Sequence, residues 1–156
     1  METLLKNKYK KISTYISNSV QDTINYAKKI AEMLVPGDIV GFIGNLGSGK
    51  THFIKGIAGG FGIKGDKVIS PTFSIVKEYN SETSLFHFDF YRINNIKELY
   101  GMGFRNYFEN EEAIIFVEWA DKIREIEDNY SYIIKLINNG KKSRRISVYK
   151  KKGKRY

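Results

Sequence analysis

The sequence predicts a single α/β domain with a mixed central sheet flanked by helices. In the first half of the chain, apolar strand-like runs alternate with segments of helical periodicity, which is typical of a parallel sheet covered by helices. The second half carries hairpin signals that a purely parallel sheet would lack. The 156 residues are 42% hydrophobic, and no repeat or linker rich in Pro, Gly or Ser divides them. Residues 1–156 are therefore expected to form a single domain.

The first half has clear start and stop signals. Ser19 followed by Asp22 opens a helical pattern, and Pro36-Gly37-Asp38 ends it. A β-rich run then leads through a glycine-rich loop into a second pattern of helical spacing. The expected elements are a strand at 10–17, a helix at 19–34, a strand at 39–43 and a helix across 53–61.

Hairpins dominate the second half. Two β-rich runs, 73–79 and 85–91, flank a polar connection, so we expect them to pair antiparallel. Asn138-Asn139-Gly140 signals a final hairpin. The other expected elements are a short helix at 96–100, a strand at 113–117, a helical segment at 121–126 and hairpin strands at 132–137 and 146–149.

The loop after 39–43 fits the phosphate-binding pattern G-x-x-x-x-G-K-[ST]. Glycines let backbone N–H groups turn around an anion, and the following helix directs its positive end towards it. The lysine supplies a charge and the threonine a hydroxyl for magnesium. A chance match has a probability of about one percent, so we expect a nucleotide site in a P-loop NTPase-like domain rather than an ordinary turn. The loop residues are Gly44, Asn45, Leu46, Gly47, Ser48, Gly49, Lys50 and Thr51.

Two acids follow apolar strands. Asp89 and Glu118 are candidates for holding magnesium and supporting hydrolysis, or are simply the first solvated residues after their strands. Ser70-Pro71-Thr72 is either a switch segment that senses a terminal phosphate or a turn before a strand. His52 and His87 are expected to be packed or surface residues, because neither has a visible triad partner or metal-ligand spacing.

The net charge of +9 lies at the C-terminal end. Residues 141–156 contain nine Lys or Arg and no acid. This basic hairpin and tail could contact nucleic acid or an acidic partner, or could be a solvated edge strand and a frayed tail. There is no cysteine, no apolar run of about 18 residues and no apolar signal-peptide core, so we expect a cytoplasmic protein without membrane contact.

Several motifs in order resemble the TsaE family of P-loop ATPases, over roughly residues 19–119. They are G-N-L-G-S-G-K-T, S-P-T-F-S-I-V-K-E-Y, F-H-F-D-F-Y-R, G-F-R-N-Y-F and V-E-W. The resemblance implies one α/β domain that binds ATP and Mg²⁺, hydrolyses ATP slowly and is active mainly in complex with partner proteins. Those partners are TsaB and TsaD, and the process is threonylcarbamoyladenosine formation in tRNA.

The resemblance also implies roles for individual residues. Lys50 would be the P-loop cation and Thr51 the magnesium hydroxyl, with Glu118 the magnesium-linked carboxylate and Asp89 the second acid. Three further positions match the family: Thr72 at the switch, Trp119 as a partner or functional residue, and Arg145 near the nucleotide.

The chain departs from the family pattern at Asn106, where an aspartate is usual, and at Ala120, where a proline is usual. Two other functions stay open. A small P-loop kinase would need an arginine lid, for which the arginines of this chain are too scattered. A nucleotide-dependent binding module would use the basic C-terminus. Because no N-K-x-D guanine signature occurs, adenine is the expected base.

Overall fold

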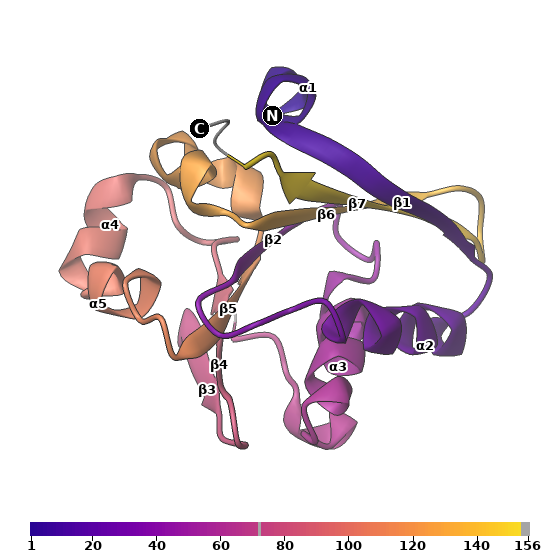
Figure 1. Ribbon diagram of the computed structural model, residues 1–156, viewed down its shortest axis with the longest axis horizontal. Helices are drawn as coiled ribbons and strands as arrows, with labels where there is room; N and C mark the ends of the chain where they lie inside the picture. Colours follow the sequence, from indigo (N-terminus) through magenta and orange to yellow (C-terminus); the bar gives the residue numbers. More distant parts are fainter. Residues whose placement is uncertain (72, 154–156) are drawn as a thin grey trace.

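The computed structural model describes residues 1–71 and 73–153, and it has a seven-stranded mixed sheet between layers of helices (Figure 1). The strands are β1 (Tyr9–Ser17), β2 (Ile39–Ile43), β3 (Val76–Tyr79), β4 (Ser84–Asp89), β5 (Ala113–Glu118), β6 (Tyr132–Asn138) and β7 (Arg144–Lys151). The α-helices are α1 (Glu2–Lys8), α2 (Val20–Ala31), α3 (Lys50–Gly60), α4 (Ile96–Gly101) and α5 (Phe104–Phe108). The 3-10 helices are η1 (Gly65–Lys67), η2 (Ala120–Lys122) and η3 (Arg124–Asn129).

The sheet has a parallel centre and antiparallel ends. Its strand order is β1-β7-β6-β2-β5-β4-β3, and the four strands from β6 to β4 run parallel. β7 and β1 extend one side antiparallel, and β3 pairs antiparallel with β4 on the other. The carboxyl ends of β2, β4 and β5 therefore meet at one edge of the sheet, which is where open α/β sheets bind ligands.

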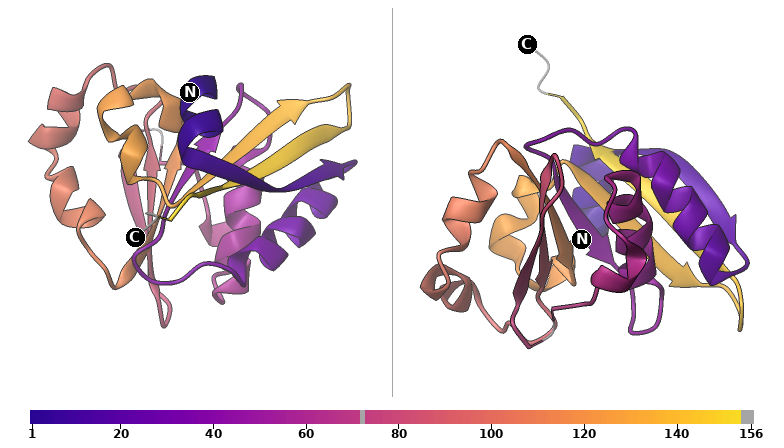
Figure 2. Two further views of the ribbon diagram at one scale, coloured as in Figure 1. Left: turned by 45° about the horizontal axis from the view of Figure 1, so that its top comes forward. Right: turned by 90° about the horizontal axis from the view of Figure 1, so that it is seen from below.

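Two apolar cores lie on opposite faces of the sheet. Helices α2 and α3 pack side by side on one face, while α4 and α5 lie on the other (Figure 2). Below the loop, the ring of Phe42 packs 5.9 Å from that of Phe53 on α3 and 6.2 Å from that of Phe116 on β5. This packing fixes β2, β5 and α3 relative to one another. No helix among the described residues is long and apolar enough to cross a bilayer.

The sequence predicted the mixed sheet, both hairpins and the two long helices. Ser19 caps α2 as expected, since its hydroxyl accepts from the backbone N–H of Asp22 at 3.0 Å. The helical segment expected at 121–126 is split into the 3-10 helices η2 and η3 by the extended residue Ile123. The basic strand β7 is not an edge strand, because it pairs with β1 on one side and β6 on the other.

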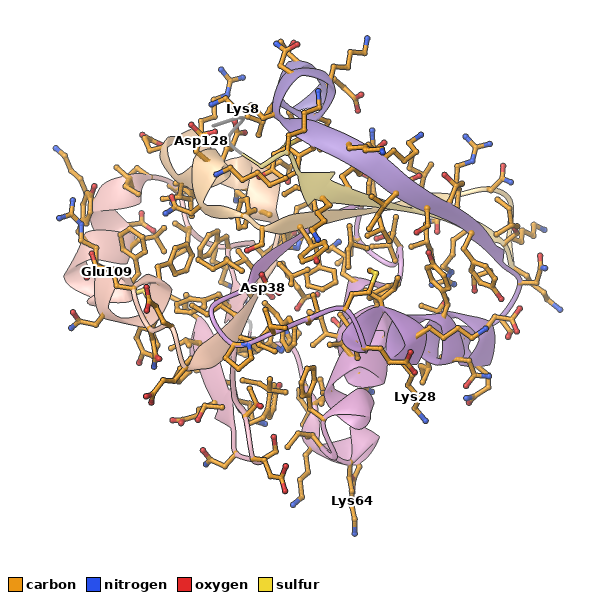
Figure 3. The ribbon with its side chains drawn as sticks, in the orientation of Figure 1. Lys8, Lys28, Asp38, Lys64, Glu109 and Asp128 are labelled. Atoms are coloured by element: carbon orange, nitrogen blue, oxygen red, sulfur yellow. The ribbon has the colours of Figure 1, made fainter. Side chains whose placement is uncertain are left out.

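Two helices were missed because they are short and depend on tertiary contacts. α1 buries only Leu5 and is tied to η3 by an ion pair between Lys8 and Asp128, 2.6 Å apart (Figure 3). α5 has five residues, and the ring of Phe104 packs edge-on against that of Phe108. Elements this short give no periodicity that can be read from sequence.

The strand expected at 73–79 begins only at Val76. Ile75 has a φ of 69°, which is unfavourable for a β-branched side chain. Hydrogen bonds hold this turn at both ends, because the backbone N–H of Ile75 donates to the carbonyl of Pro71 and its own carbonyl accepts from Asp89. The strained residue therefore joins the Ser70-Pro71 segment directly to the end of β4.

Candidate functional site

The loop between β2 and α3 is shaped by its glycines. Gly47 and Gly49 have φ values of 78° and 100°, in the region that only glycine adopts readily. A Cβ on Gly44 would lie 2.7 Å from the carbonyl oxygen of Leu136 and would collide with Ser48. The loop can therefore close tightly at the positive end of α3, as an anion site requires.

Lys50 folds back over this loop. Its Nζ donates to the carbonyl oxygens of Gly44 at 2.5 Å and Asn45 at 3.0 Å, and it lies 4.2 Å from the centre of the Trp119 ring. Burial lowers the pKa of Lys50, although the nearby carboxylates of Glu118, Asp89 and Asp121 oppose that shift. The ammonium group is thus held beside the loop by contacts that a phosphate could replace.

The two predicted acids lie on neighbouring parallel strands. Asp89 and Glu118 are register partners at the ends of β4 and β5, and each is nearly buried. Thr51 donates to Glu118 Oε1 at 2.9 Å. The Ser70 hydroxyl lies 2.7 Å from Asp89 Oδ2 and 2.9 Å from Glu118 Oε2. The P-loop threonine, the two acids and the segment at 70–71 therefore form one connected cluster.

Glu118 is held in its ionised form by its neighbours. Burial by itself would raise the pKa of the carboxyl group, but hydrogen bonds from His87, Thr51 and Ser70, with attraction to His87, outweigh that effect and lower the pKa. The His87 Nε2 lies 2.8 Å from Glu118 Oε2. The Glu118 carboxylate therefore carries the negative charge that a bound cation would require.

These groups line one cavity of about 340 Å³ at the carboxyl edge of the sheet. Among the described residues, no group of three or more His, Cys, Asp or Glu is arranged to hold a metal. The residues lining the cavity are Leu46, Gly47, Gly49, Lys50, Thr51, His52, Ser70, Asp89, Tyr91, Glu118 and Trp119. The cavity therefore combines backbone amides, a cation, hydroxyl groups and two carboxylates.

Trp119 faces this cavity because the strand has already ended. In a continuing strand it would point away from the side of Glu118. Instead its φ of 58° turns the chain, and the indole packs 5.1 Å from the ring of Tyr91 and over Lys50. Trp119 is therefore a half-buried wall of the site rather than a core residue.

The arginine beside the loop is Arg144 rather than Arg145. Arg144 Nη1 donates to the carbonyl oxygen of Ser48 at 3.1 Å, and a Cβ on Gly49 would collide with the guanidinium group. Arg145 is exposed, and neither arginine lines the cavity itself. Since neighbouring side chains in a strand lie on opposite faces, Arg145 points away from the loop contact made by Arg144, and its predicted place near the nucleotide stays a prediction.

Most of the predicted site residues are thus brought together by the structure. Thr72, the predicted switch residue, and the end of the basic tail at 154–156 lie outside the described residues. His87 is packed, as expected, but its contact with Glu118 was not predicted, nor were the contacts of Ser70 with the two acids. One signal was available for His87: it alternates with Phe86 and Phe88 inside a strand buried on both faces, where a polar side chain requires a partner.

A parallel strand, a glycine-rich phosphate loop, a following helix and a carboxylate at the end of the adjacent strand define the class of P-loop proteins. A family model described as "Threonylcarbamoyl adenosine biosynthesis protein TsaE" matches residues 17–146. The chain belongs to the TsaE family.

Similar proteins agree with this assignment. Relatives named tRNA threonylcarbamoyladenosine biosynthesis protein TsaE are 42% identical over 106 residues in Bacillus subtilis and 39% identical over 114 residues in Rickettsia typhi. These matches cover 67% and 70% of this chain, and 65% and 75% of the relatives. The crystal structure of Bacillus subtilis YdiB is 30% identical, with a TM-score of 0.72 over 92% of this chain and 88% of YdiB.

Proposed function

We propose that this protein is a Mg²⁺-dependent ATPase that serves threonylcarbamoyladenosine formation in tRNA. One observation carries the proposal: the phosphate loop with Lys50, the hydroxyl of Thr51 and the carboxylates of Asp89 and Glu118 share one cavity. Membership of the TsaE family supports the biological process, because the relatives are named for it.

The loop would bind the triphosphate through backbone N–H groups and the positive end of α3. Lys50 would exchange the carbonyls of Gly44 and Asn45 for phosphate oxygens, a short movement of a flexible side chain. Arg144, which rests on the loop at Ser48, adds positive charge at the rim. Adenine remains the expected base, since the guanine signature is missing from the sequence.

The oxygen ligands at the site suit Mg²⁺, which prefers carboxylate, hydroxyl and phosphate oxygens. Thr51 and Glu118 would hold the ion, with Asp89 as the second acid. When bound, the ion neutralises charge that develops on the phosphates. Asp89 is held by the backbone N–H of Tyr91 at 2.9 Å, so its carboxylate is already oriented towards the cluster.

We further propose that the protein acts in the cytoplasm with TsaB and TsaD, and that Trp119 and Tyr91 help to transmit partner binding to the site. Tyr91 is 45% exposed at the mouth of the cavity, and its ring touches that of Trp119. A partner that covers Tyr91 would therefore press on Trp119, whose ring lies against Lys50.

Phosphate release measured with and without purified TsaB and TsaD tests the proposal. Stimulation of turnover by the two proteins is the expected result. Transfer of phosphate to an added acceptor would indicate a kinase instead. Tight ATP binding without turnover under either condition would indicate a nucleotide-dependent binding module.

A further inference from the structure

His87 is a fully buried histidine for which the proposed chemistry has no direct use. It lies within β4 on the same face as Asp89, two residues away, and none of its surface is accessible. Its Nε2 lies 2.8 Å from Glu118 Oε2, and its Nδ1 lies 3.1 Å from the hydroxyl of Tyr79. Burying a polar ring without hydrogen-bond partners costs free energy, so His87 keeps both contacts. Together they fix the orientation of the imidazole ring.

Tyr79 extends this chain of contacts to the main chain. It is almost completely buried, and its hydroxyl donates to the carbonyl oxygen of Ile69 at 3.1 Å. Burial raises the pKa of Tyr79 to about 12, so the hydroxyl keeps its hydrogen. Ile69 immediately precedes Ser70, whose own hydroxyl reaches Glu118. Glu118 is therefore tied to this stretch of backbone by two separate routes.

We propose that His87 and Tyr79 are positioning residues, which orient the Glu118 carboxylate for magnesium and couple it to the backbone at Ile69. The inference rests on the proposed function, because it takes Glu118 as the magnesium-linked carboxylate. Neither residue would touch ATP or the ion.

The geometry explains how such positioning works. His87 and Ser70 both bind Oε2 of Glu118, whereas Oε1 faces the hydroxyl of Thr51. The carboxylate therefore cannot rotate freely, and one oxygen stays directed at the P-loop hydroxyl. A shift of the backbone at Ile69 would move Tyr79, then His87, and so change the angle of the metal-binding group. Groups that orient a metal ligand in this way typically change metal affinity or activity about 10–100-fold when removed.

The first test compares His87→Leu with His87→Gln. Leucine removes the donor to Glu118, whereas the glutamine amide can replace Nε2 but not the contact to Tyr79. We expect His87→Leu to raise the Mg²⁺ concentration for half-maximal hydrolysis, or lower kcat, by about 10–100-fold. The KM for ATP at saturating Mg²⁺ and the affinity for ADP in EDTA should stay near wild type. His87→Gln should recover part of the loss.

The second test removes one hydroxyl group. Tyr79→Phe should shift the same Mg²⁺ dependence in the same direction by a smaller factor. Tyr9→Phe is the matched control, because Tyr9 is also buried and donates to a backbone carbonyl, that of Tyr130 at 2.7 Å, outside the site. It should lower thermal stability to a similar extent and leave the Mg²⁺ dependence unchanged.

A folded His87→Leu protein with the Mg²⁺ dependence of wild type would overturn the inference. If that variant fails to fold, His87→Gln and Tyr79→Phe decide, and wild-type Mg²⁺ dependence in both would overturn it. Glu118→Gln distinguishes a failure of the proposed function from a failure of the positioning role. If Glu118→Gln hydrolyses ATP normally, the proposed function fails, whereas an impaired Glu118→Gln beside unaffected His87 and Tyr79 variants rejects only the positioning role.

Discussion

The parallel and antiparallel halves of the sheet contribute to the site in different ways. In the parallel half, Asp89 and Glu118 reach the cavity because each stands at the carboxyl end of a buried strand. In the antiparallel half, Arg144 reaches the loop because its side chain points to the correct face of β7. The two acids reach the cavity because of their position at the end of a strand. Arg144 reaches the loop because side chains alternate between the two faces of a strand.

The two halves also differ in electrostatic environment. The acids and Lys50 are almost buried, where charge interactions are strong, whereas most lysines of β7 and the adjoining residues are exposed and screened by salt. Substitutions in the parallel half should therefore have the larger effects.

Lys50→Ala should produce the largest loss. Each charge-assisted hydrogen bond to phosphate contributes about 1.5–3 kcal/mol, so we expect ATP affinity to fall roughly 100-fold with little change in the fold. Lys55→Ala is the matched control, because Lys55 follows on α3 but does not line the cavity. Calorimetry that gave Lys50→Ala the affinity of wild type would refute the P-loop assignment.

Glu118→Gln and Asp89→Asn should separate binding from hydrolysis. The loop amides still hold the phosphates, so ATP affinity should change little, while turnover should fall roughly 10–100-fold as magnesium placement weakens. Glu112→Gln, on the exposed turn before β5, should behave as wild type. Unchanged turnover in both site variants would mean that the acids are only strand ends.

Arg144→Ala and Arg145→Ala test which of the two arginines serves the nucleotide. Loss of the Arg144 contact should weaken nucleotide binding by roughly 5-fold, corresponding to about 1 kcal/mol for one hydrogen bond. Arg145→Ala should leave affinity unchanged. The reverse pattern would support the prediction that Arg145 lies near the nucleotide.

Removing residues 152–156 should have the smallest effect on the site. Strand β7 continues to Lys151, so a cut after that residue keeps the pairing with β1 and deletes Lys152, Lys154 and Arg155. ATP affinity should not change. If these residues contact tRNA, the salt dependence of tRNA binding should become shallower by about 0.9 units for each lost phosphate contact. Equal slopes would support a solvated tail.

The sequence predicted the features that depend on local patterns, but not those that depend on contacts between distant segments. The loop, the helix that follows it and the strand-end acids are local patterns, so the sequence predicted where the loop, α3 and the ends of β4 and β5 lie in the chain. The contacts of His87 with Glu118 and of Ser70 with Asp89 join β4, β5 and the segment at 70–71, and no local sequence pattern predicts them. The turn at Trp119 and the choice between Arg144 and Arg145 needed the actual backbone direction.

The position of Trp119 gives the protein an internal optical reporter. It is the only tryptophan in the chain, and its indole lies against the amine of Lys50. Any ligand that draws Lys50 towards phosphate must change the electric field on that ring. Tryptophan emission should therefore report nucleotide binding to the loop in real time, without a label or a modified nucleotide. The rate of the emission change should give the rate at which Lys50 leaves the carbonyls of Gly44 and Asn45.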